Sequence, residues 1–211
     1  MQLDLFPLDT VLFPGATMPL RIFEPRYLDM IQRCVADDLP IGIVLLRKGR
    51  VESPGEVEVH EIGTIAEIIS VEPADDETLN ILVAGRRRFH VQRLIQFRPR
   101  LIADIVESPC TEPLDYALPA PFAQLRDRFA DYHRLLFAAT GQWTRHLTLP
   151  ADPEALTEFV GAALQIDNRE RQILLEQSSP ASLARLELTI IRRELPALRR
   201  VRADREERRS N

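Results

Sequence analysis

With 211 residues, the chain is long enough for one large domain or two small ones. Its hydrophobic content of 45% and charged content of 28% are ordinary for a globular protein, and no apolar run approaches the roughly 18 residues that span a bilayer. The start, Met1-Gln2-Leu3-Asp4, lacks the basic segment and apolar core of a secretory signal, so we expect a cytoplasmic protein without membrane contact. The net charge of −5 argues against nucleic acid as a partner of the whole surface.

The first half of the chain alternates short apolar segments with turn residues. Pro14-Gly15 predicts a turn, and an extended segment follows from Met18 to Ile22. Pro25 suits the first turn of a helix, whose predicted apolar stripe comprises Tyr27, Leu28, Ile31, Cys34 and Val35. Further strands are predicted at residues 41–46, 57–60, 62–71, 79–83, 89–92 and 101–106. Many short strands at this spacing predict a closed or nearly closed barrel with one inserted helix.

The second half changes to helical periodicity after a proline-rich boundary at residues 109–121. Apolar residues then recur at three and four positions, and capping signals at Asp152, Asp167 and Ser179 begin three further helices. Pro196 is expected to kink or end the last helix. The apolar stripe of the first of these helices comprises Phe122, Leu125, Phe129, Tyr132 and Leu136. We therefore predict two domains, a barrel at residues 1–110 and a helical subdomain at 111–211.

Three ordered motifs in the first half carry a family resemblance. Phe6-Pro7-Leu8, Val11–Gly15 and Met18-Pro19-Leu20 together resemble the start of the amino-terminal substrate-binding domain of the Lon proteases. Residues 61–68 and 82–88 are similar to the two later signatures of that domain, in the right order. The resemblance implies an α+β fold, mainly β and then α, in which a PUA-like pseudo-barrel of about six strands precedes a helical bundle.

Lon proteases join this domain to an ATPase and a protease domain, and the sequence shows neither chemistry. An ATPase phosphate loop ends in Gly-Lys-Ser/Thr, but Lys48 is the only lysine and lies in no such motif. The Ser-Lys protease pair would also require Lys48, and no recognisable nucleophile motif accompanies it. We therefore expect a protein that is not an enzyme, for which a peptidase family name describes ancestry only.

The sequence also predicts no metal site and no cofactor. The four histidines at 60, 90, 133 and 146 show no metal-ligand spacing, either among themselves or with the two cysteines. Two cysteines do not form a disulfide framework, and Cys34 is expected to be a small buried hydrophobe on the predicted helix.

Arg86, Arg87 and Arg88 have two interpretations. Three arginines beside an aromatic residue suit phosphates and a stacked base, so an RNA-binding PUA-like barrel is one alternative. However, residues of a strand alternate between its two faces, so the three side chains do not all reach one ligand. We favour an exposed strand with salt-linked arginines.

A proline-constrained surface is the first candidate binding site. Aromatic and proline residues gather there, namely Phe13, Pro14, Pro19, Phe23 and Tyr27, and we expect Arg21, Glu24 and Arg26 to lie exposed beside them. The aromatic side chains suit a core as well as a binding surface, with Tyr27 favouring the core. Apolar side chains inserted between barrel and bundle, or a strand added to an open barrel edge, are two available binding modes.

The resemblance implies a free-standing, non-catalytic module that binds unfolded or exposed polypeptide segments in protein quality control. A further alternative is an adaptor for a separate ATP-dependent protease or ATPase. Residues 199–211 hold six arginines and three acids, a local charge of +3 that leaves −8 elsewhere. Such a segment is typical of a solvated helix end, and contact with an acidic partner is the alternative.

Overall fold

The computed structural model describes residues 1–48, 57–74, 78–108, 120–140 and 147–210. Contacts divide the chain into two compact units, the first comprising Met1–Thr111 with Ala162–Glu176 and the second Glu112–Gly161 with Gln177–Asn211. The sequence predicts a single boundary after residue 110, whereas the structure groups Ala162–Glu176 with the amino-terminal half. Most of the predicted proline-rich boundary lies outside the described residues.

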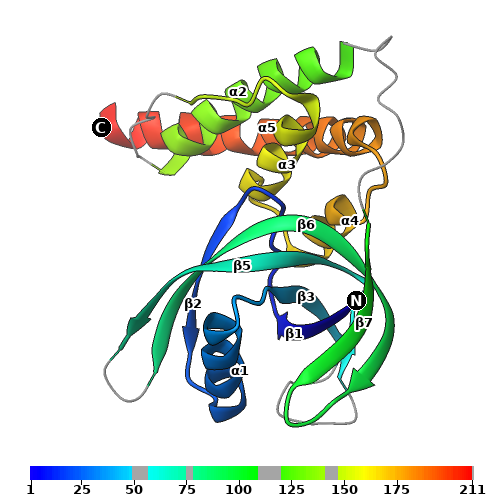
Figure 1. Ribbon diagram of the computed structural model, residues 1–211. Helices are drawn as coiled ribbons and strands as arrows, with labels where there is room; N and C mark the ends of the chain where they lie inside the picture. The colour runs from blue at the N-terminus through cyan, green and yellow to red at the C-terminus, as the bar shows by residue number, and fades with distance from the viewer. Residues whose placement is uncertain (49–56, 75–77, 109–119, 141–146, 211) are drawn as a thin grey trace. The chain divides into compact units, whose positions relative to one another are not determined.

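The first unit is built on a seven-stranded, mostly antiparallel sheet (Figure 1). Its strands are β1 (Gln2–Leu8), β2 (Thr17–Ile22), β3 (Ile41–Lys48), β4 (Glu58–Val59), β5 (Ile62–Pro73), β6 (Leu79–Gln96) and β7 (Leu101–Glu107). β1 pairs with β7 on one side and, in parallel, with β3 on the other, so that β1, β7, β6, β5 and β3 form a closed ring. The expected barrel and the α+β class are thereby confirmed.

β6 is the longest strand and organises the sheet. The sequence predicts separate strands at 79–83 and 89–92, but these are one continuous strand that pairs first with β2 and β5 and then with β5 and β7. At Gly85 the strand meets the Pro14-Gly15 turn, because Gly85 N–H donates to Ala16 O and Gly15 N–H donates to Gly85 O, both at 2.9 Å. A Cβ at Gly85 would stand 2.3 Å from Phe13 O, so only glycine fits this contact.

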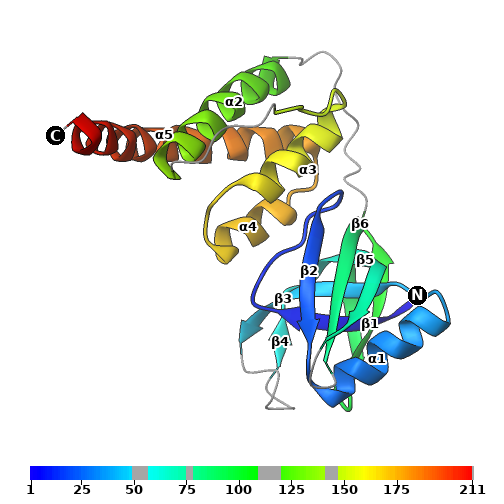
Figure 2. The ribbon, with the colours of Figure 1, turned by 90° about the vertical axis from the view of Figure 1, so that its left-hand side faces the viewer.

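Helix α1 (Pro25–Ala36) packs its apolar stripe against the barrel (Figure 2). Tyr27, Met30, Ile31 and Cys34 are buried, at helical spacings of three and four. The sequence places Val35 in this stripe, which is wrong: Val35 is 50% exposed. An apolar side chain is therefore left at the surface in the last turn of α1.

Helix α4 (Asn168–Leu175) joins the first unit through a half-buried arginine, Arg171. The Arg171 guanidinium donates to the carbonyl oxygens of Ala162, Leu164 and Val11, each at 3.2 Å, and lies 5.5 Å from the centre of the Phe13 ring. Burial lowers the pKa of Arg171 from its ordinary value. Three carbonyls from two chain segments thus share one donor group.

Two further side chains hold α4 against the barrel. Arg88 of β6 is buried and its Nε donates to Leu175 O at 2.8 Å, which places a cation at the carboxyl-terminal end of the helix. Gln172 Nε2 donates to Ile62 O, the first residue of β5, at 2.9 Å. These side chain-to-backbone bonds explain why Ala162–Glu176 groups with the barrel rather than with the other helices.

The second unit contains α2 (Ala120–Thr140), most of α3 (Pro153–Ala163) and α5 (Pro180–Ser210). The predicted apolar periodicity is confirmed in α2, where Leu125, Phe129 and Tyr132 are buried. The predicted caps form as well: Asp152 Oδ2 accepts from Ala155 N at 2.8 Å and Ser179 Oγ accepts from Ser182 N at 3.1 Å.

Helix α5 continues through Pro196 to Ser210, so of the kink or end expected at Pro196, the end is wrong. Pro196 is exposed, whereas Leu195 beside it is buried. Beyond the proline, Arg205 Nη1 donates to Ala139 O of α2 at 2.8 Å. Contacts on both sides of Pro196 therefore offset its missing N–H.

The α4 contact predicts a large effect of Arg171→Leu. Removing the guanidinium leaves three carbonyls without their donor, so we expect a loss of about 2–4 kcal/mol in the free energy of unfolding, measured in urea. Arg169→Leu, an exposed position of the same helix, is the matched control and should change stability by less than about 0.5 kcal/mol. Equal losses in the two variants would show that Arg171 does not hold the helix.

Candidate functional site

The structure separates the aromatic residues of the predicted binding surface. The Phe13 side chain is 0% exposed and Tyr27 is 4% exposed, so both belong to the core. The Tyr27 ring meets Phe6 edge-on at 4.4 Å between centroids, and the Arg26 guanidinium lies 4.8 Å from the Tyr27 centroid. A ligand cannot contact the Phe13 or Tyr27 ring without displacing core side chains.

The remaining predicted residues differ in their exposure to solvent. Phe23 is 67% exposed, and Pro19 and Arg21 occupy exposed alternate positions of β2. Glu24 and Arg26 form an ion pair at 2.5 Å. Pro14 is half-buried in its turn. Of the predicted aromatic cluster, only Phe23 therefore presents its ring to solvent.

Arg86, Arg87 and Arg88 do not act together. Arg86 pairs with Glu67 at 2.6 Å and Arg87 with Glu107 at 2.9 Å, both on the surface. Arg88 is buried against α4. Two adjacent arginines are exposed because β5 and β6 shift register there: Ile65 pairs with Arg87 and Ala66 with Gly85, leaving Arg86 in a bulge.

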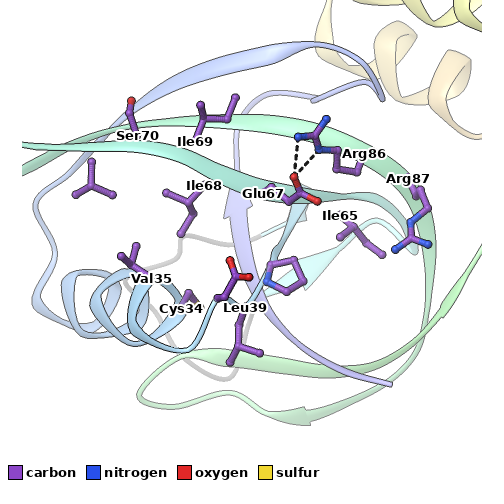
Figure 3. Close-up of a pocket in the computed structure, with 13 residues that line it drawn as sticks. Cys34, Val35, Leu39, Ile65, Glu67, Ile68, Ile69, Ser70, Arg86 and Arg87 are labelled. Carbon is purple, nitrogen blue, oxygen red and sulfur yellow. Dashed lines mark hydrogen bonds and ion pairs between the residues drawn. The ribbon is translucent and has the colours of Figure 1, made fainter.

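A groove lies between the end of α1 and strand β5, with a volume of about 590 Å³ (Figure 3). Volumes of this size are typical of ligand sites. We name it the α1–β5 groove; Val35 and Leu39 line one wall, Ile68 and Ile69 the other, and Arg86 and Arg87 complete it.

Apolar side chains in the α1–β5 groove are exposed to solvent. Val35 is 50%, Leu39 45% and Ile69 52% exposed. Ile69 stands in a second bulge, because Ile68 pairs with Val83 and Ser70 pairs with Leu82. Ile68 and Ile69 project from opposite sides of β5 (Figure 3). The groove therefore extends around the edge of the strand.

The edge of β5 at this groove has no strand partner within the described part of the chain. β3 pairs with β5 only at Thr64, Ile65 and Ala66. β6 pairs with the other side of β5 as far as Pro73. From Glu67 onward, β5 is therefore a one-sided edge strand.

Sequence reasoning missed this site for identifiable reasons. The helical pattern places Val35 in the buried stripe, and strict alternation along the predicted strand at 62–71 gives no sign of the bulge that exposes Ile69. The turn residue Leu39 carried no signal of its own. The sequence suggests an open barrel edge as a binding mode, and it singles out Arg86 and Arg87 of the groove, although as a phosphate site.

Among the described residues, no group of His, Cys, Asp and Glu is arranged to hold a metal ion. His60 lies 3.1 Å from Glu176 and His90 lies 3.3 Å from Glu61, as separate pairs. Cys34 is buried, and burial raises the pKa of its thiol, which disfavours the reactive thiolate. Cys110 and His146 lie outside the described residues. None of the described helices combines the length and apolarity required to cross a bilayer.

The fold and groove define an α+β barrel domain with an open strand edge. Residues 2–193 match the family model described as the ATP-dependent protease La (LON) substrate-binding domain. The chain belongs to this family.

Curated relatives include Lon protease 2 of Myxococcus xanthus, 28% identical over 202 residues, and Lon protease 1 of Hydrogenovibrio crunogenus, 27% identical over 168 residues. The alignments cover 93% and 80% of this chain but 24% and 21% of those proteins, so the chain spans less than a quarter of their length.

Solved structures show the same fold. A Lon N-terminal domain protein from Xanthomonas campestris superposes with a TM-score of 0.67 at 24% identity, over 90% of this chain and 98% of that one. The N-terminal domain of a Mycobacterium avium complex Lon protease gives 0.62 at 20% identity, with the same coverage. The expected family and fold are thereby confirmed.

The burial of Tyr27 predicts a specific pH dependence of stability. Desolvation by burial raises the pKa of Tyr27 from 10.0 to about 12. The positive charge of Arg26 lowers this pKa and the negative charge of Glu24 raises it, each by less than desolvation does. Between pH 10 and 12 the unfolded chain loses this proton while the folded chain keeps it, so stability falls as pH rises. We expect urea unfolding to show about 1.4 kcal/mol less stability at pH 11 than at pH 9 from this residue.

Tyr27→Phe removes this ionisation and isolates its effect. The variant should lose less stability than the wild type between pH 9 and pH 11, by the amount given above. Identical losses in the two proteins would contradict the assigned environment of Tyr27.

Proposed function

We propose that this protein binds exposed apolar segments of unfolded polypeptides in the α1–β5 groove, without catalysing a reaction on them. The observation that carries the proposal is the exposure of Val35, Leu39 and Ile69 around one groove. Burying these side chains under a ligand removes apolar surface from water, which is favourable by about 25 cal/mol of free energy per Å² of that surface. The matched family model, which is that of a substrate-binding domain, supports the same function.

RNA binding is less well supported by the surface. Of the three adjacent arginines predicted as a phosphate site, the two exposed ones are already paired, Arg86 with Glu67 and Arg87 with Glu107. The acidic partners would have to be displaced before a phosphate could bind. Arg88 lies in the interior, where it contacts α4 rather than solvent. Glu67 also adds negative charge to the groove itself.

We further propose that polypeptide binding serves protein quality control, in which the protein would present its ligands to a separate ATP-dependent protease. The support is the kinship with Lon proteases, of which this chain matches less than a quarter. Co-purification tests this part of the proposal. The wild-type protein should retain such a protease when an unfolded protein is present.

The binding proposal predicts that Val35→Asp combined with Ile69→Asp weakens the binding of an unfolded protein. Fluorescein-labelled, reduced and carboxymethylated α-lactalbumin is a suitable probe, measured by fluorescence anisotropy. Charges at two contact positions should raise Kd at least tenfold, which corresponds to about 1.4 kcal/mol or more. Both positions are exposed, so the folded state should persist, as checked by circular dichroism.

Two other exposed apolar residues provide matched controls. Phe97→Asp, at a position 46% exposed outside the groove, should leave Kd unchanged. Phe23→Asp tests the surface that the sequence favours. Loss of binding in the Phe23 variant alone would move the site from the groove to β2 and the start of α1.

A further inference from the structure

We propose that the polypeptide in the α1–β5 groove binds as an added β-strand along the edge of β5 from Glu67 to Pro73. This inference rests on the proposed function and specifies its binding mode. The occupant is an extended segment, held by main-chain hydrogen bonds as well as by apolar contacts.

The hydrogen-bonding pattern of β5 is the first argument. On one side, pairing with β6 continues from Glu67 opposite Ala84 to Pro73 opposite Leu79. On the other side, the ladder with β3 stops where Ile41 faces Ala66. The backbone groups beyond this point that face away from β6 are those that an extended peptide satisfies.

The chain itself turns away from this edge. Continuing the β3 ladder backward would place Pro40 opposite Glu67, but proline has no N–H to donate. Asp38 adopts a positive φ of 51°, which directs the chain from the end of α1 into β3 instead of along β5. A peptide strand would therefore lie beside β5 in line with β3, beyond Ile41, and would continue the existing sheet.

Side chains along the edge project to both faces of β5, although the bulge at Ile69 interrupts their regular alternation. Ile68 and Val71 belong to the apolar cluster packed with α1, whereas Glu67 and Ile69 are exposed. The groove contacts residues of both kinds. Because successive side chains of a strand point to opposite faces, an added strand meets Val35 and Leu39 with one set and Ile69 with the other. A helix would place only one face against the edge and would leave the backbone groups of the β5 edge without hydrogen-bond partners.

The two register shifts limit how much can be added. The bulges at Arg86 and Ile69 disrupt the flat continuation of the sheet on either side of Ile68. Short segments therefore fit better than an open-ended stack of strands. Sheet extension by a second copy of this chain is the competing occupant and is included in the test.

Backbone N-methylation of a probe peptide tests the inference directly. The probe is fluorescein-labelled acetyl-Thr-Val-Thr-Val-Thr-Val-Thr-amide, with one version N-methylated at every valine and another at every threonine. Alternate N–H groups of a strand point to the same edge, so one version blocks the edge that pairs with β5 and the other leaves it free. We expect one version to bind at least tenfold more weakly than the unmethylated probe, and the other to bind within about threefold of it.

Hydrogen exchange of the full-length protein, followed by NMR, provides the second readout. Binding of the unmethylated probe should slow exchange of amides within Glu67–Pro73, whereas the weakly binding version should not. Protection of this edge in the free protein, together with a dimer in sedimentation, would instead assign it to a second copy and overturn the inference.

The outcomes separate the binding mode from the function. Equal binding of all three probes, with loss in the Val35→Asp/Ile69→Asp variant, would overturn strand addition and leave the groove as a binding site. Binding of carboxymethylated α-lactalbumin without competition from any probe would likewise overturn strand addition. Absence of binding to α-lactalbumin and to every probe would overturn the proposed function itself.

Discussion

The attachment of helix α4 to the barrel depends on the Arg171 guanidinium, which donates to three carbonyls at once. One of these carbonyls belongs to Val11, and Phe13 beside it packs under the same guanidinium. The turn that follows Phe13 is bonded to Gly85 of β6. Arg171 thus stabilises the segment that positions the long strand, and β6 in turn holds β5 and its edge. An arginine is suited to this position because its fixed fork of donors can serve several acceptors, whereas an apolar residue would leave all three unsatisfied.

Local features of the fold could be predicted from the sequence because they depend on neighbouring residues. The caps at Asp152 and Ser179 and the turn at Pro14-Gly15 form as expected, since each involves a few consecutive positions. The attachment of α4 could not be predicted. Arg171 and Gln172 act on carbonyls more than a hundred positions away in Val11 and Ile62, and a carbonyl carries no side-chain signal. The continuity of β6 is not apparent for a related reason: its two apolar segments are joined by Gly85 and three charged arginines, and a glycine inside a strand usually weakens it.

The candidate site was harder to predict than the fold. Aromatic side chains such as Phe13 and Tyr27 have large apolar surfaces, and both the core and a binding surface use them. Only the tertiary structure decides between the two, and it buries both rings. The exposed residues Val35 and Ile69 lie where local periodicity fails, at the end of a helix and in a bulge. An unpaired edge is itself a non-local property, because it depends on where β3 leaves the ladder rather than on the composition of β5.

An open strand edge with apolar neighbours also favours aggregation by edge-to-edge pairing, so such an edge needs features that limit pairing. The structure shows three features that do so. The Glu67–Arg86 ion pair places charges beside the edge, the bulge at Ile69 interrupts its regular spacing, and Pro73 ends the strand without a donor. Each feature hinders indefinite sheet growth, yet none fills the groove between Val35 and Ile69. An edge that only needed protection would be better covered by extending β3 along it; one that remains accessible but restricted is suited to short, reversible contacts with extended chains.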